Sequence, residues 1–205
     1  MALVKRLTLM FLCWLPLLSR GQTNDAFAAA GSLGRGVNML GYDRIWENRA
    51  EGRFQPRYFK LIKQAGFDHV RINLFPFRQM DETNHWAIQR GWFETLDWIL
   101  QLAREQKLKV ILDLHEFTAI GKDPAAHRER FLAFWRQLAA HCAREPDDVL
   151  FEVLNEPSEK LTPELWNEFF GEALTVIREK NPARTVVVGP GFWNSLDHLD
   201  KLKLP

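Results

Sequence analysis

The strongest constraint on the fold is the regular recurrence of short apolar runs that are rich in β-branched residues. Five such runs predict strands, and their starts lie about 35 to 40 residues apart along the chain. The third and fifth runs are almost continuously apolar, as strands are when a parallel sheet is covered on both faces. The predicted strands are Gly36–Leu40, His69–Leu74, Lys109–His115, Val149–Asn155 and Thr185–Gly189.

The segments between these runs have apolar residues at helical spacings of three and four. Three helices are predicted at Pro56–Ala65, Trp92–Gln106 and Ala125–Arg144, and a fourth begins after Thr162 with Pro163 at its first position. Strands and helices that alternate without a linker predict one α/β domain. A closed eight-stranded barrel and an open doubly wound sheet both satisfy this pattern.

The N-terminal segment has the pattern of a signal peptide. Lys5 and Arg6 precede an apolar run too short to span a membrane, and Ala26-Phe27-Ala28 matches a small-x-small cleavage motif. We therefore expect residues 1–28 to be removed. Residues 29–205 then form one secreted or periplasmic domain that has no contact with the membrane. An uncleaved anchor is the alternative, and the shortness of the run argues against it.

Composition and charge exclude several functional classes. The net charge is +1, and loss of three basic residues and one acidic residue with the signal peptide leaves −1. A near-neutral chain has no electrostatic footprint for nucleic acid. Of the two cysteines only Cys142 would remain, which excludes an intramolecular disulfide in the processed chain. The pair His115-Glu116 lacks a second ligand at zinc spacing, so we expect neither a metal nor another cofactor.

Polar side chains stand at the carboxyl ends of the predicted strands. Arg71 and Asn73 lie on the second strand, Asp113 and His115 end the third, and Glu156 follows the fourth. In a parallel barrel these ends meet at one rim, where such folds place their active sites. We interpret His115 as a residue of this site, because carboxylates flank it in the sequence.

The fourth predicted strand supplies the candidate proton donor. Pro157 cannot donate to a sheet ladder, so the strand stops before it and Glu156 lies at the rim. A carboxyl group partly shielded from water keeps its proton to higher pH and can act as a general acid, although an acidic residue can also merely end a strand. Strict alternation places Glu152 on the face of Glu156, where it needs a cation such as Arg71. Asn155 then reaches the same cleft only if the strand is irregular near Pro157.

Taken together, these segments resemble glycoside hydrolase family 5, the cellulase-type (β/α)8 barrels of clan A. The resemblance extends over about residues 34–196 and depends on the order of the pieces more than on any one of them. It implies a TIM-barrel fold and hydrolysis of O-glycosyl bonds by two glutamates with retention of anomeric configuration. The matching pieces are Gly36-Val37-Asn38, Val70-Arg71-Ile72-Asn73, Leu112-Asp113-Leu114-His115, Phe151–Pro157 and Val188–Asn194.

The resemblance also implies a role for each candidate site residue. Glu156 corresponds to the catalytic acid/base, and Asn155 to the residue that contacts the sugar 2-hydroxyl. His115 corresponds to a histidine that lines the central subsite, and Arg71 to the arginine that holds the nucleophile side of the site. The other candidates for binding or orienting the substrate are Asn38 and Trp193, the latter as an aromatic platform.

By this resemblance, the expected substrate is a β-linked polysaccharide or oligosaccharide, and the expected protein is a monomeric secreted endo-β-1,4-glucanase of the cellulase or lichenase type. The alternatives are a β-mannanase, an exo-glucosidase, and an inactive or merely glycan-binding fragment. The sequence stops at Pro205, after the fifth predicted strand, whereas a full barrel takes about 250 residues and eight strands. We therefore expect a truncated barrel whose nucleophilic glutamate lies beyond residue 205, and little or no activity of this chain alone.

Overall fold

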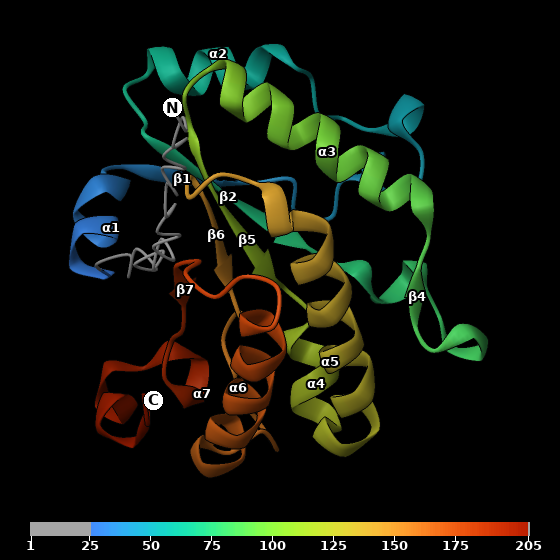
Figure 1. Cartoon of the computed structure of the whole chain (residues 1–205), viewed down its shortest axis with the longest axis vertical. Coiled ribbons are helices and arrows are strands. Elements are labelled where there is room, and N and C mark those ends of the chain that lie inside the picture. The colour runs from blue at the N-terminus through green and yellow to red at the C-terminus, as the bar shows by residue number, and fades with distance from the viewer. Residues whose placement is uncertain (1–25, 205) are drawn as a thin grey trace, which may run out of the picture.

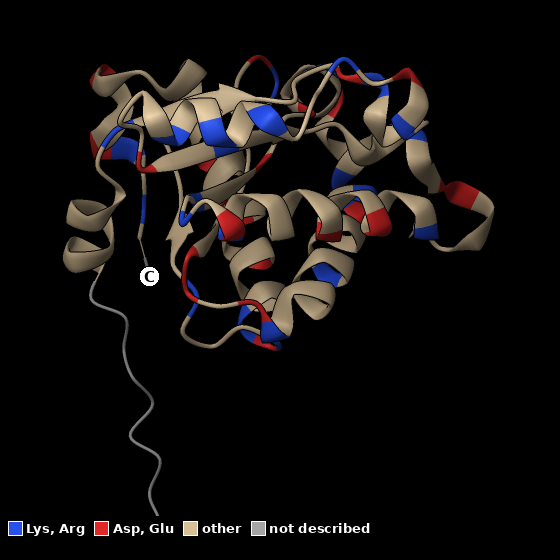
Figure 2. Ribbon diagram, turned by 90° about the horizontal axis from the view of Figure 1, so that it is seen from above, with Lys and Arg blue, Asp and Glu red and all other residues tan. Residues whose placement is uncertain are grey.

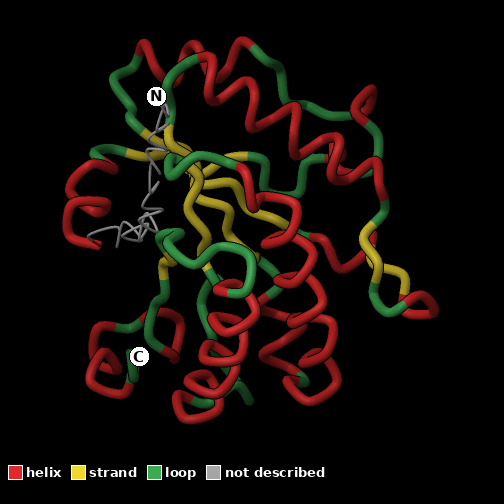
Figure 3. The backbone as a smooth tube through the Cα atoms, in the orientation of Figure 1, coloured by secondary structure: helices red, strands yellow, loops and turns green. Residues whose placement is uncertain are grey.

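A computed structural model describes residues 26–204, and its centre is a parallel sheet of five strands. Four helices, α2, α3, α5 and α6, lie along the outer side of this sheet (Figure 1), and Figure 3 shows the strands as one central layer beside them. The strands of the sheet, in spatial order, are β1 (Gly36–Met39), β2 (His69–Leu74), β5 (Lys109–Leu114), β6 (Val149–Glu152) and β7 (Val186–Val187). A separate antiparallel hairpin contains β3 (Met80–Asp81) and β4 (Ala87–Ile88).

The helices alternate with the strands of the sheet. The α-helical segments are α1 (Ala26–Leu33), α2 (Arg57–Gln64), α3 (Arg90–Glu105), α4 (Phe117–Lys122), α5 (Pro124–His141), α6 (Pro163–Arg178) and the short α7 (Gly191–Asn194). Short 3-10 turns cover Arg44–Trp46, Arg49–Glu51, Pro76–Gln79, Glu82–Asn84, Cys142–Arg144 and Leu196–Lys201.

The strand order distinguishes between the two architectures that the sequence allows. A doubly wound sheet reverses its strand order and carries helices on both faces. Here the five strands follow one another in chain order, and the crossover helices lie on one side, as in the first five units of a (β/α) barrel. The structure therefore confirms the predicted barrel-type fold and excludes the doubly wound architecture.

Helix α6 begins as its sequence predicts. The hydroxyl of Thr162 accepts a hydrogen bond from the backbone N–H of Leu165 at 3.4 Å, and Pro163 occupies the first position. Helix α5 begins in the same way, because Asp123 accepts from Ala126 at 3.1 Å ahead of Pro124. Both helices therefore start at a residue that satisfies an otherwise free amide.

Large aromatic side chains fill the layer between the sheet and its outer helices. Trp92, Trp135 and Trp166 are each at most 1% exposed. The indole of Trp135 donates to the carbonyl of Val153 at 3.2 Å, and that of Trp166 donates to the carbonyl of Gly189 at 2.9 Å. Helices α5 and α6 are thereby attached to the segments that follow β6 and β7, which are the segments that carry the candidate site.

The structure corrects the carboxyl ends of four predicted strands. β1 ends one residue early, before Leu40, whose φ of 67° is incompatible with a strand. β5 also ends one residue early, at Leu114. β6 ends at Glu152 instead of Asn155, and β7 has only two paired residues. Apolar residues continue beyond the last paired residue of β1, β6 and β7, whereas β5 is followed by His115 and Glu116.

Acidic and basic residues are interspersed along the outer helices of the described chain (Figure 2), in keeping with its near-zero net charge. None of the helices described is both long enough and apolar enough to cross a membrane. The predicted signal peptide falls almost wholly on residues 1–25, which lie outside the described part of the chain. Residues 26–28 of that prediction form the start of α1.

Candidate active site

The guanidinium of Arg71 is the centre of the polar network at the carboxyl ends of the strands. It forms a bidentate ion pair with Glu152 at 2.6 and 2.7 Å, which confirms the partner predicted from alternation. It also donates to Asn155 Oδ1 at 2.9 Å and to Asn38 Oδ1 at 3.3 Å, and it lies 3.0 Å from Asp113. One side chain thus links residues from four strand segments.

Burial and ion pairing act in opposite directions on the two members of this pair. For Arg71, burial lowers the pKa, but the hydrogen bond to Glu152 and nearby carboxylates outweigh it and the pKa is raised. For Glu152, which is 8% exposed, burial raises the pKa and Arg71 opposes that rise. The stability of this buried ion pair therefore depends on its geometry, because burying either charge without the other would be costly.

His115 is held by a second part of the same network. Its Nδ1 is in hydrogen-bonding contact with Asp113, which is fully buried, and Asn73 donates to Asp113 at 2.9 Å. A carboxylate oxygen can only accept, so Nδ1 is the donor in this contact, and the amide nitrogen of Asn73 also lies 3.0 Å from Nδ1. The rings of Phe75 and Phe117 lie edge-on to the imidazole at 5.1 and 5.4 Å, which fixes its plane.

Glu156 lies where the backbone turns out of the β6 line. Its φ is 43°, a left-handed value that costs a non-glycine residue about 1–2 kcal/mol. The preceding residue, Asn155, is still tied to the sheet, because its N–H donates to the carbonyl of Leu114 at 2.9 Å. This irregularity is the one required for Asn155 and Glu156 to face the same cleft. Glu156 is half-buried, and its charge contributes to the raised pKa of Arg71.

Trp193 belongs to the segment that follows β7. Its backbone N–H donates to the carbonyl of Pro157 at 3.0 Å, and its side chain is 47% exposed. Phe192, Trp193 and Asn194 all have φ values between 57° and 59°, so α7 is a left-handed turn and not an ordinary helix. The structure therefore places Trp193 beside the candidate acid but outside the network of Arg71.

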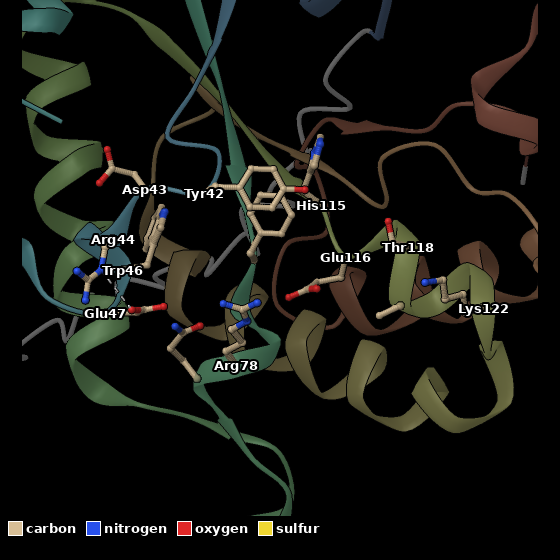
Figure 4. A pocket seen from close by; sticks show the side chains of 13 residues that line it. Tyr42, Asp43, Arg44, Trp46, Glu47, Arg78, His115, Glu116, Thr118 and Lys122 are labelled. Carbon is tan, nitrogen blue, oxygen red and sulfur yellow. Dashed lines mark ion pairs between the residues drawn. The ribbon is translucent and has the colours of Figure 1, made fainter. Parts of the chain in front are cut away.

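A cavity of about 680 Å³ opens beside His115, between the segments that follow β1, β2 and β5 (Figure 4). Tyr42 and Phe75 stack on its wall with ring centroids 4.3 Å apart. Glu116 also lines it and accepts a hydrogen bond from the N–H of Phe77 at 2.8 Å. Burial raises the pKa of Glu116, and the Phe77 amide and Arg130 oppose that rise.

Sequence reasoning missed the residues of this cavity other than His115 and Glu116. Tyr42 follows the glycine pair around the first strand, and Gln79 lies in the loop after the second, without a motif that marks either residue. Tyr42 has a φ of 54°, which a propensity argument disfavours for an aromatic residue. Among the described residues, no group of three or more His, Cys, Asp or Glu side chains is arranged to hold a metal ion.

Comparison with known proteins shows what this chain is similar to. Residues 30–205 match the family Cellulase (glycosyl hydrolase family 5). Endoglucanase H of Acetivibrio thermocellus is 27% identical over 88% of this chain, and cellodextrinase A of Ruminococcus flavefaciens is 26% identical over 85%. The chain spans 20% and 53%, respectively, of the length of these two relatives.

Among solved structures, the endoglucanase Cel5A of Thermotoga maritima superimposes with a TM-score of 0.82 at 35% identity, over 88% of this chain and 59% of its own. That enzyme has also been solved in complex with mannotriose and with cellobiose, at TM-scores of 0.80. The structural similarity therefore extends over most of this chain.

Proposed function

Because the chain belongs to glycosyl hydrolase family 5, the cellulase family, we propose that it supplies the acid/base half of a retaining endo-β-1,4-glucanase, with Glu156 as the proton donor. One observation carries this proposal. The backbone turns Glu156 out of the β6 line immediately after Asn155, which Arg71 holds in place at 2.9 Å. A carboxyl group beside a fixed scaffold is the arrangement that proton transfer to a leaving oxygen needs.

In the proposed reaction, the carboxyl of Glu156 protonates the glycosidic oxygen as the bond to the anomeric carbon breaks. A second carboxylate attacks that carbon from the opposite side, at about 5–5.5 Å from the first. Glu156 then removes a proton from the water that releases the sugar. The solved Cel5A relative contains chain beyond the 59% that is covered here, and we assign the second carboxylate to that part of the barrel.

The neighbours of Glu156 take positioning roles in the proposal. The Oδ1 of Asn155 is occupied by Arg71, so its amide nitrogen is left to donate to a sugar hydroxyl. The Oδ1 of Asn38 also accepts from Arg71, at 3.3 Å, so the amide nitrogen of Asn38 is likewise left to donate. His115 is fixed through Nδ1, so Nε2 is the atom that contacts the sugar. Trp193, half exposed beside Pro157, is an aromatic surface for a sugar ring.

The proposed substrate is a β-1,4-glucan, supported by the endoglucanases among the relatives. A β-mannan is the second candidate, because the Cel5A relative has been solved with mannotriose as well as with cellobiose. We further propose that residues 29–205 belong to one monomeric domain that is secreted after removal of residues 1–28. Exo-action and a glycan-binding role without catalysis are the competing functions.

The test is hydrolysis of carboxymethylcellulose and barley β-glucan by the protein as its gene encodes it. Exchange of Glu156→Gln keeps the size of the side chain and removes its proton transfer, so we expect kcat to fall by about 10²–10⁴-fold. The matched control is Glu159→Gln, at an exposed glutamate three residues away that also has a left-handed φ. Full activity of the Glu156→Gln protein, or release of the α-anomer first by NMR, would overturn the proposal.

A further inference from the structure

The orientation of the His115 ring depends on a polar neighbour. Phe75 and Phe117 lie edge-on to the imidazole, but a half turn of the ring about its Cβ–Cγ bond would leave both of these contacts in place. The same half turn would exchange each ring nitrogen for a carbon. Hydrogen bonding therefore decides which nitrogen is available on the cavity side, and Nδ1 makes its contact with Asp113.

Asp113 lies where it cannot touch a ligand itself. Its side chain is fully buried, and His115 lines the cavity whereas Asp113 does not. Asp113 is on β5, two residues before His115, and it stands opposite Asn73 of β2 in the parallel register. Any effect of Asp113 on a bound substrate must therefore pass through the residues that it contacts.

The polar contacts of the Asp113 carboxylate converge on one of its two oxygens. Nδ1 of His115, the amide nitrogen of Asn73 at 2.9 Å and the guanidinium of Arg71 at 3.0 Å all contact Oδ2. Oδ1 is buried without a hydrogen-bond partner among the described residues. An asparagine at this position would keep its carbonyl oxygen where the three donors meet, so it would lose the charge and retain the acceptor.

The negative charge of Asp113 exceeds what Arg71 requires. Glu152 already forms a bidentate ion pair with Arg71, at 2.6 and 2.7 Å. A second buried carboxylate beside one guanidinium adds a desolvation cost and brings no second cation. The pairing of Arg71 alone therefore does not account for Asp113, whereas its contact with His115 gives it a task in the site.

We propose that Asp113 is a positioning residue, which fixes the imidazole of His115 with Nδ1 as the donor and so leaves Nε2 as the nitrogen available to a substrate. The inference rests on the proposed function, because it takes His115 as a residue that contacts the sugar. It adds to that function a buried carboxylate that acts on the substrate through another side chain.

The first test is a double-mutant cycle on the hydrolysis of β-glucan by the protein as its gene encodes it. Asp113→Ala removes the acceptor, so kcat/KM should fall by about 10–100-fold, whereas Asp113→Asn keeps an acceptor and should lose far less. In a His115→Ala background, Asp113→Ala should cause no further loss, because the residue through which it acts is absent. An equal fold loss in both backgrounds would overturn the proposal, since it would show a general effect on the fold.

The second test does not depend on catalysis. In the full chain labelled with ¹⁵N-histidine, NMR near pH 8 shows which nitrogen of His115 carries the hydrogen, since an ordinary imidazole, with a pKa of about 6.5, is neutral there. We expect the hydrogen on Nδ1 in the parent and in Asp113→Asn, and an exchange between both nitrogens in Asp113→Ala. The matched control is Asp148→Ala, at an exposed aspartate directly before β6, which should change neither this signal nor kcat/KM.

A hydrogen confined to Nε2 in the parent chain would overturn the proposal, and this result is readable even where Asp113→Ala does not fold. A His115 signal that is the same in the parent and in a folded Asp113→Ala protein would also overturn it. Hydrolysis of β-glucan that depends on Glu156 would uphold the proposed function in either case.

Discussion

Exchange of Arg71→Met tests whether the network at the strand ends is held by a single cation. Methionine fills much of the same space but removes the partner of Glu152 and a neighbour of Asp113. These carboxylates are 8% and 0% exposed, so water cannot replace the lost contacts. Removal of one member of a buried ion pair costs about 3–5 kcal/mol, and we expect this loss in the free energy of unfolding near pH 8.

The pH dependence of this loss follows from the carboxyl that remains. Burial raises the pKa of Glu152, and without Arg71 that rise is unopposed. A carboxyl whose pKa is higher in the folded than in the unfolded state destabilises the fold at high pH, where it must ionise, and this penalty vanishes below the unfolded pKa of about 4.3. The difference in the free energy of unfolding between the Arg71→Met protein and the parent chain should therefore become smaller as the pH falls from about 8 towards 4.

Urea denaturation followed by circular dichroism measures both effects. Arg71→Lys keeps the charge but not the bidentate geometry, so it should lose less than Arg71→Met at every pH. Adding Glu152→Gln to the Arg71→Met protein should recover part of the stability near pH 8, because the uncompensated charge is then absent. A loss below about 1 kcal/mol for Arg71→Met, or a loss that does not vary with pH, would refute the reasoning.

Two further predictions concern Arg184 and Cys142, which are both buried. Arg184 donates to four backbone carbonyls between Cys142 and Val149, so Arg184→Met should lower the free energy of unfolding by about 3 kcal/mol, whereas Arg90→Met at an exposed site should leave it unchanged. Burial raises the pKa of the Cys142 thiol to about 12, so in a Cys13→Ser background iodoacetamide should label the chain at about pH 8 only after unfolding; rapid native labelling would contradict this.

The ion pair that the sequence predicted joins two regular strands, β2 and β6. Period-two alternation placed Glu152 deep in the barrel, where it needs a cation such as Arg71, and the structure confirms their ion pair. The sequence required an irregular backbone near Pro157 if Asn155 and Glu156 were to face one cleft, but it did not predict the form of that irregularity. Pro157 indicates that the strand stops, and it does not indicate which direction the chain then takes. In the structure, the chain turns because Glu156 adopts a left-handed backbone conformation, which no local propensity favours for glutamate.

The part that the sequence did not predict lies in the loops of the rim. Helix α4 is six residues long and follows the third strand without a periodic pattern long enough to detect. The stacking of Tyr42 on Phe75 joins the segments after β1 and β2, and depends on left-handed values at Leu40 and Tyr42. The Oε1 of Gln79 is buried without a hydrogen-bond partner among the described residues, and this is a property of packing that the residue type does not indicate.

The most direct test of the central claim, that Glu156 donates the proton, uses two leaving groups. Glu156→Ala in the protein as its gene encodes it is assayed on a cello-oligosaccharide and on the matching 2,4-dinitrophenyl glycoside. The dinitrophenolate departs without a proton, so the variant should lose about 10²–10⁴-fold in kcat/KM on the oligosaccharide and far less on the aryl glycoside. An equal loss on both substrates would contradict the claim, because it would show that Glu156 acts by some means other than proton donation.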